Sequence, residues 1–276
     1  MIIISGTYRT GTSLMMQIME EAGFDVLGEK FPKAWKGANN HLNKEGFYES
    51  RWIDKGVNKE NCKLDPKATQ LKACKVFTHG LATTDIEYMH KCILMTRDWR
   101  EQHNSATILD ETNRKSHGKK LVGYYPPGQV FLINYAKFLA DFSKRKYPSI
   151  VVDFNDLVSQ PVKTCQRIRN FLGAGRFDLA AQRIKPKLKT VSETGPEWKE
   201  PFHLFMDRFY KKLKTGHLEA TFLKEAQAWI NKVSPEIQKF NELRKSEDGD
   251  DATPQAEVDG AQVAQVDQGE ASHPAA

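Results

Sequence analysis

The chain has 276 residues, of which 39% are hydrophobic and 10% aromatic, so it can bury a substantial core in one large α/β domain or two small ones. Eight of its 35 acidic residues and none of its 41 basic residues lie after position 245, so residues 1–245 carry a net charge of +14 and predict an anionic partner. No stretch approaches the ~20 apolar residues that span a bilayer, the start lacks a basic leader, and the four cysteines show no paired framework, so we expect a cytoplasmic protein without stable membrane insertion.

Residues 1–23 predict a strand, a loop and a helix. The β-branched run at residues 2–4 is typical of a buried parallel strand, and apolar residues then recur at helical spacing from Leu14 to Ala22, just before Gly23. Between these segments, small and hydroxylic residues surround one cation, Arg9. A strand, a glycine loop and a helix in this order direct backbone N–H groups at a phosphate.

The loop nearly fits the nucleotide-binding pattern G-x-x-x-x-G-K-[ST]. Gly6 and Gly11 have the required spacing and Ser13 takes the hydroxyl position, but Thr12 stands where the pattern has lysine. That lysine normally reaches the β- and γ-phosphates of a triphosphate. Because the cation lies within the loop as Arg9, the loop can bind phosphate but is a poor site for the γ-phosphate of ATP.

The remaining elements follow from hydrophobic periodicity and turn residues. Further strands are expected at residues 73–77, 91–96 and 149–154, and residues 24–28 predict a short extended segment or a turn. Helices are expected from residue 51 and over 85–90, 129–146, 161–172, 201–214 and 217–244, with a helix or polar turn at 97–105. Residues 29–46 and 110–128 predict long polar loops, the second lying over the site, and residues 176–200 are basic and irregular.

Strands that alternate with helices predict a three-layer α/β/α fold with a mostly parallel sheet, of the P-loop NTPase type. We expect a single domain over residues 1–245, followed by a disordered acidic tail at 246–276. In such a sheet, ligands lie beyond the carboxyl ends of the strands. Three of these ends carry polar residues: the loop at 6–13, the Lys75 and His79 region, and the segment from Arg97 to Ser105.

At these places the chain resembles the sulfotransferases that use 3′-phosphoadenosine 5′-phosphosulfate (PAPS). That family's 5′-phosphosulfate loop, P-[KR]-[ST]-G-T-[ST], is similar to Gly6-Thr7-Tyr8-Arg9-Thr10-Gly11-Thr12-Ser13. Its 3′-phosphate segment has an arginine at a strand end and a serine eight residues later, which resembles Arg97 and Ser105. Residues 43–49 resemble the stretch N-P-x-G-[FY]-[FY]-E of bacterial members, and residues 152–161 resemble Y-E-D-L-x-x-x-P.

The resemblance implies PAPS as the donor, adenosine 3′,5′-bisphosphate (PAP) as the product, and in-line transfer of a sulfuryl group to a hydroxyl or amine, with no metal. It also implies that the loop binds the 5′-phosphosulfate and that Arg97 and Ser105 bind the 3′-phosphate. Arg9 would stabilise the leaving phosphate as negative charge develops on it.

Three residues are candidates for the general base that the acceptor requires. His79 is the first, because residues 75–81 resemble the family's K-T-H-L-P strand end, whose histidine is the base. The lysine and histidine are four residues apart here rather than two, so Lys75 is an alternative aligned residue that would contact the sulfate. Glu49 is the rival base, since some relatives use a glutamate from the region after the first helix, and Glu29 is a third candidate.

Other polar and aromatic residues near these motifs have less specific interpretations. Tyr8 and Trp99 either stack on adenine, line the acceptor pocket or pack in the core. Arg100 and His103 are expected to be solvated residues of a helix. In members of that family, a loop in a basic stretch often closes over the 3′-phosphate. The region of Lys185, Lys187 and Lys189 resembles that stretch.

Two other functions are considered. A nucleotide or small-molecule kinase is disfavoured by Thr12 in the lysine position and by the lack of a strand-ending aspartate for Mg²⁺. A non-enzymatic binding protein for acidic polymers or nucleic acid would leave the loop at 6–13 unexplained, and no nucleic-acid motif is present. The acceptor is expected to be a small, sugar or lipid-like molecule, with the charge of the polar loops favouring an anionic or sugar-like one.

Overall fold

A parallel sheet forms the centre of the molecule. The computed structural model describes residues 1–33, 43, 45–185, 198–216 and 220–248. The sheet has the order β2-β3-β1-β4-β5, and every neighbouring pair is parallel, which confirms the predicted α/β class. The strands are β1 (Ile2–Ser5), β2 (Asp25–Leu27), β3 (Lys72–Lys75), β4 (Lys91–Thr96) and β5 (Ser149–Asp153).

Helices cover both faces of the sheet, which explains why β1 and β4 are continuous apolar runs rather than alternating ones. One face packs on α1 (Thr12–Glu21), α5 (Phe154–Ser159), α6 (Pro161–Leu172) and α7 (Phe177–Arg183). On the other side, α2 (Thr78–Leu81), α4 (Gln129–Arg145) and α8 (Pro201–Thr215) share a core with the strands, and α9 (Ala220–Asp248) extends that core by packing on α4. Two short 3₁₀ helices, η3 (Lys67–Thr69) and η4 (Ile86–Tyr88), lie in connections.

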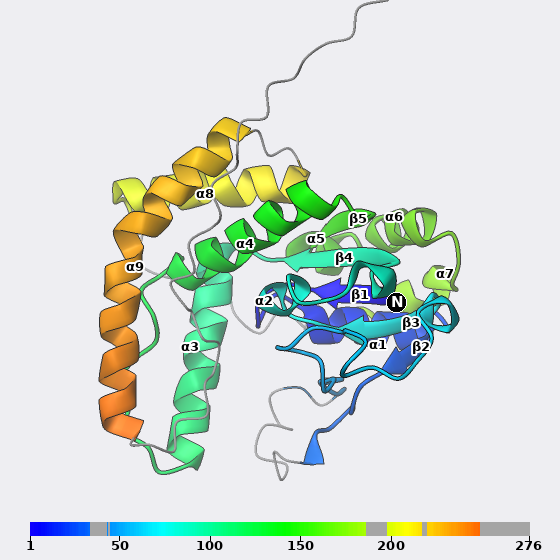
Figure 1. The fold of residues 1–276 in the computed structure, drawn as a ribbon, viewed down its shortest axis with the longest axis horizontal. Coiled ribbons are helices and arrows are strands. Elements are labelled where there is room, and N and C mark those ends of the chain that lie inside the picture. Colours follow the sequence, from blue (N-terminus) through cyan, green and yellow to red (C-terminus); the bar gives the residue numbers. More distant parts are fainter. Residues whose placement is uncertain (34–42, 44, 186–197, 217–219, 249–276) are drawn as a thin grey trace, which may run out of the picture.

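The helix α3 (Trp99–Ser116) follows β4 and runs beside α9 away from the sheet (Figure 1). The prediction of a loop at 110–128 is therefore wrong at its start, since residues 110–116 are helical. Tertiary contacts explain the difference: the buried Asp110 accepts a hydrogen bond at 2.6 Å from Arg244 of α9, and Tyr125 donates one to Asn241. The polar residues at 110–116 form a helix because α9 supplies a partner for the charge of Asp110.

Other elements also differ from the sequence-based expectation. The helix expected from residue 51 is wrong: residues 51–55 form turns, and Gly56 ends them with a left-handed φ of 69°. The helices α2, α5 and α7 were not expected, the last because residues 176–200 read as irregular. The predicted tail begins too early, since α9 extends to Asp248. Residues 249–276 lie outside the described part of the chain.

Burial confirms the role expected for the cysteines. All four are buried and free, and Cys74 and Cys92 lie in the core. Within the described residues, no helix combines the length and the apolar character needed to cross a membrane.

Candidate functional site

The loop between β1 and α1 has a backbone that only particular residues can adopt. Gly6 has a φ of 151°, and an added Cβ would lie 2.7 Å from the carbonyl oxygen of Met95. Arg9 has a left-handed φ of 67°, which is uncommon for a non-glycine residue and is typical of functional loops. Thr10 stabilises the turn, because its hydroxyl donates to the carbonyl of Thr7 at 2.6 Å.

A series of backbone N–H groups in the loop stays unpaired within the described part of the chain. Gly11 precedes the first turn of α1 with a φ of 93°, and no side chain caps the helix. Among the described residues, none accepts a hydrogen bond from the backbone N–H groups of residues 9–14. Together with the positive end of the α1 dipole, these donors form a site for an anion.

Arg9 adds a cation to this site without a carboxylate to neutralise it. Its Nε donates to the Ser105 hydroxyl at 2.9 Å, which joins the loop to α3. Burial, and then the nearby Arg97 guanidinium, lower the pKa of Arg9 to about 10. No carboxylate in the described part of the chain pairs with it. A partly buried arginine without a carboxylate partner, beside unpaired N–H donors, has the chemistry that suits an anion.

The structure brings Arg97 to the same place from the end of β4. Its terminal nitrogen Nη1 lies 3.5 Å from the carbonyl oxygen of Arg9, and its guanidinium lies 4.5 Å from the centre of the Phe154 ring. On the inner side, Nε donates to Glu101 at 2.9 Å. Arg9, Arg97 and Ser105, which the sequence placed in two motifs, therefore lie within one cluster.

Lys75 supplies a cation where the nucleotide-binding pattern has its lysine. Its side chain extends from the end of β3 beneath the loop, and Nζ donates to the Ser13 hydroxyl at 3.2 Å, to Glu49 at 2.7 Å and to the carbonyl of Phe47 at 2.6 Å. The side chain is only 1% exposed. Burial lowers the pKa of Lys75, and the charge of Glu49 opposes that change. The missing lysine of the loop is thus replaced by one from the neighbouring strand.

Glu49 is held under the loop by a strained and well-anchored segment. Tyr48 has a left-handed φ of 56°, and its hydroxyl donates to Glu20 of α1 at 2.6 Å. Glu49 and Glu29 exchange two backbone hydrogen bonds in an antiparallel bridge. Burial raises the pKa of Glu49 above its ordinary value of 4.5, and Lys75 opposes the rise. A carboxylate with a raised pKa beside a buried lysine suits proton transfer.

His79 lies near the loop through its backbone but points its ring elsewhere. His79 belongs to α2. The backbone N–H of Thr78, the first residue of α2, donates to the carbonyl of Gly6 at 3.3 Å. The imidazole Nε2 lies 2.9 Å from Asp54, an exposed carboxylate. The three candidates therefore separate into two groups: Glu49 and Lys75 meet at Ser13, while His79 pairs with Asp54.

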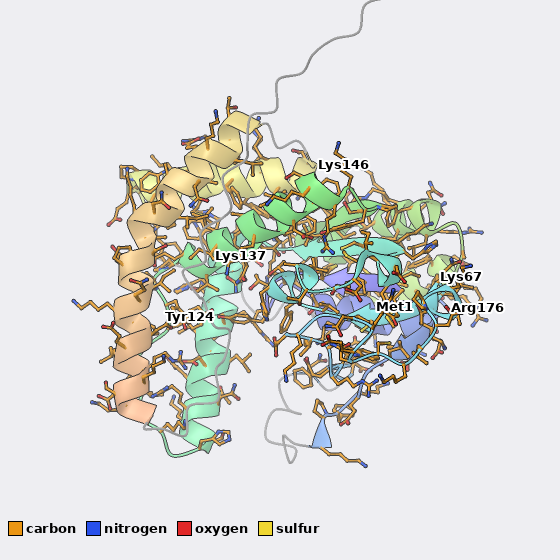
Figure 2. All side chains as sticks on the ribbon, viewed as in Figure 1. Met1, Lys67, Tyr124, Lys137, Lys146 and Arg176 are labelled. Carbon is orange, nitrogen blue, oxygen red and sulfur yellow. The ribbon has the colours of Figure 1, made fainter. Side chains whose placement is uncertain are left out.

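The aromatic residues near the loop pack together. Trp99 is buried in a cluster with the rings of Trp198 and His203, at centroid distances of 5.2 and 5.6 Å, which shows it to be a packing residue. Tyr8 packs edge-on against Tyr124, which lies alongside α3 (Figure 2). Tyr124, from the segment predicted to lie over the site, thus contacts Tyr8 of the loop.

Two expectations for α3 are wrong. Arg100 is not simply solvated, since it pairs with Asp207 of α8 at 2.5 Å. His103 packs on the rings of Tyr124 and Trp198, and burial lowers the pKa of its imidazole to about 4. Of the basic stretch expected over the 3′-phosphate, only Lys185 is described, and Lys187 and Lys189 lie outside the described residues.

Sequence reasoning missed several polar residues that support the loop. Gln102 donates to the carbonyl of Tyr8 at 3.1 Å, and Asn134 of α4 donates to the Thr7 hydroxyl at 3.3 Å. Glu101 and Asn155 bond to each other beside Arg97. Only the helical spacing of Glu101 and Gln102 after Arg97 could have indicated them, because Asn134 and Asn155 come from distant segments. Within the described chain, no group of three or more His, Cys, Asp or Glu residues could hold a metal ion.

Gly11 provides a test of the loop's geometry. An added Cβ at this position would lie 2.6 Å from Cδ2 of Phe154, so we expect Gly11→Ala to lower the free energy of unfolding by more than left-handed strain alone, which is about 1–2 kcal/mol. Gly123→Ala is the matched control, since Gly123 has a φ of 79° but no atom within 4 Å of an added Cβ. Urea unfolding measures both variants. Equal losses would contradict the close contact with Phe154.

Comparison with known proteins adds no family to this description. No protein-family model matches the chain, and no curated protein matches it. What the site can bind and do therefore follows from its geometry and its charge.

Proposed function

We propose that this protein is a PAPS-dependent sulfotransferase that transfers a sulfuryl group to a hydroxyl or amine of a small, sugar or lipid-like acceptor. The observation that carries the proposal is Arg9, a partly buried cation with no carboxylate partner among the described residues, in a loop with unpaired N–H donors. A second arginine, Arg97, and the Ser105 hydroxyl lie beside it. Such a site suits a ligand with two anionic groups, and PAPS has two: the 5′-phosphosulfate and the 3′-phosphate.

The residues divide between the two ends of such a donor. The N–H groups of the loop and Arg9 would bind the 5′-phosphosulfate, and Arg97 and Ser105 would bind the 3′-phosphate. In this structure Arg9 and Ser105 are joined directly at 2.9 Å, so the two anion sites are adjacent. An arginine fork suits phosphate, because its donors are rigid and always charged near neutral pH.

The contacts of Glu49 and Lys75 support a role for both residues in the transfer step. PAPS supplies an activated sulfuryl group, whose bond to the phosphate oxygen breaks as the acceptor oxygen or nitrogen bonds to sulfur. Glu49 takes the proton of the acceptor, and its raised pKa favours that role. Lys75, at 3.2 Å from Ser13, stabilises negative charge on the sulfuryl oxygens. Arg9 stabilises the phosphate that leaves with the electron pair.

A nucleotide or small-molecule kinase is the second candidate, and one observation favours it. Lys75 places an ammonium group beside Ser13, which is where the loop's own lysine would act on a triphosphate. Arg97 and Ser105 have no assigned role in that function. We therefore rank it below sulfuryl transfer. A cytoplasmic location remains a prediction from the cysteine content.

Thermal shift measurements distinguish the two candidates. PAP should raise the melting temperature, because a ligand that binds only the folded state stabilises it by an amount that grows with the logarithm of its concentration over its dissociation constant. ATP with Mg²⁺ should raise the melting temperature less. Stabilisation by ATP with Mg²⁺ alone would exclude the sulfotransferase and favour the kinase. A screen of labelled PAPS against phenolic, sugar and lipid hydroxyls would then identify the acceptor.

A further inference from the structure

We infer that Glu101 is a positioning residue that holds Arg97 in the orientation needed for the 3′-phosphate, with Asn155 holding Glu101 in turn. The inference rests on the proposed function and extends it to residues that do not touch the donor. Glu101 is fully buried in α3, four residues after Arg97. A carboxylate in that position has a cost of desolvation that only specific partners offset.

Each carboxylate oxygen of Glu101 has a different partner. Oε2 accepts from Arg97 Nε at 2.9 Å, and Oε1 accepts from Asn155 Nδ2 at 3.2 Å. Arg97 stands at the end of β4 and Asn155 at the start of α5, directly after β5. Glu101 therefore links the carboxyl ends of two neighbouring strands at the point where the donor would bind.

The contacts around Arg97 restrict the plane of its guanidinium. The Glu101 carboxylate accepts a hydrogen bond from Arg97 Nε, and the Arg97 guanidinium lies over the Phe154 ring. The same ring lies so close to Gly11 that an added Cβ there would be 2.6 Å from it. With Nη1 3.5 Å from the carbonyl of Arg9, the terminal end of Arg97 points toward the loop. The distance between the two anion sites is thus set through Phe154 and Glu101.

If Glu101 acted through its charge alone, it would weaken phosphate binding rather than support it. A carboxylate 2.9 Å from Arg97 repels a phosphate that approaches the same guanidinium, so its removal should tighten phosphate binding by Coulomb's law. A positioning role predicts weaker binding on removal, because the arginine loses its fixed orientation and its fork no longer matches the phosphate. The sign of the change therefore separates the two effects.

The test compares two ligands that differ only in the 3′-phosphate. Calorimetry gives the affinities of the whole chain for PAP and for adenosine 5′-monophosphate, and their ratio measures the 3′-phosphate site. We expect Glu101→Gln to lower that ratio about tenfold, which is the effect of one misdirected hydrogen bond to a charged group. Glu111→Gln is the matched control, since Glu111 also lies on α3 but pairs at 3.9 Å with an exposed Lys115, and it should leave the ratio unchanged.

The outcomes separate this inference from the proposed function. If the unmodified protein binds neither ligand, the proposed function fails and the inference fails with it. If the unmodified protein prefers PAP and Glu101→Gln keeps or increases that preference, only the inference is overturned. Should Glu101→Gln not fold, Asn155→Ala removes the amide contact alone and should lower the same ratio by a smaller factor, whereas an unchanged ratio would overturn the inference.

Discussion

Arg9→Ala is expected to lower the affinity for PAP about 10- to 100-fold and to abolish sulfuryl transfer. The reason is that Arg9 is the loop's only cation and no described carboxylate compensates it. A hydrogen bond to a charged group contributes about 1.5–3 kcal/mol, which corresponds to that range of affinity. The rate of transfer should fall by a larger factor than the affinity for PAP, because negative charge on the leaving phosphate grows as the reaction proceeds. Calorimetry with PAP and a turnover assay with labelled PAPS measure the two effects.

Two further variants control this experiment. Arg183→Ala removes an arginine whose side chain is 70% exposed and which pairs with Glu21, and it should change neither quantity. Arg9→Lys keeps the charge but loses the fork, so it should recover part of the binding and less of the turnover. Unchanged affinity for PAP in Arg9→Ala would show that the anion site lies elsewhere.

Glu49→Gln is expected to lower kcat by about 10²- to 10⁴-fold, the usual effect of removing a general base, while PAP binding persists. The pH profile gives a second signature. Because burial raises the pKa of Glu49, its carboxylate gains a proton at a higher pH than an ordinary glutamate with a pKa of 4.5. Turnover should therefore fall as the pH is lowered toward and through that raised pKa, and this acidic limb should be absent in Glu49→Gln.

The competing bases are tested in the same assay. Glu87→Gln is the matched control, since Glu87 also pairs with a lysine at 2.7 Å but on the exposed surface. His79→Ala should leave most of the turnover, because its ring pairs with Asp54 rather than with the loop. If His79→Ala abolishes transfer while Glu49→Gln retains it, the base is His79. If only Glu29→Gln abolishes transfer, the base is Glu29, which lies across the backbone bridge from Glu49.

Short-range patterns in the chain were sufficient for the central elements. The apolar runs at residues 2–4 and 91–96 predicted buried parallel strands, and the spacing of Gly6 and Gly11 predicted the loop between β1 and α1. These patterns were reliable because a β-branched apolar run favours a strand covered on both faces and because glycine adopts a left-handed backbone at little cost. Patterns of this kind failed at residues 51–55 and 110–116, where contacts with distant segments decide between turn and helix.

The candidate site shows the same division. By itself, the sequence determined the α/β class and the presence of cations at three strand ends, and it predicted a phosphate-binding loop. Only the tertiary structure decided which of them meet: Arg9 reaches Ser105 across 96 positions, and Lys75 reaches Ser13 across 62. It also decided that His103 is buried and that Glu101 holds Arg97. The physical reason is that burial and pairing of charges depend on where the strands end in space, which the order of strands in the sheet determines and local sequence does not.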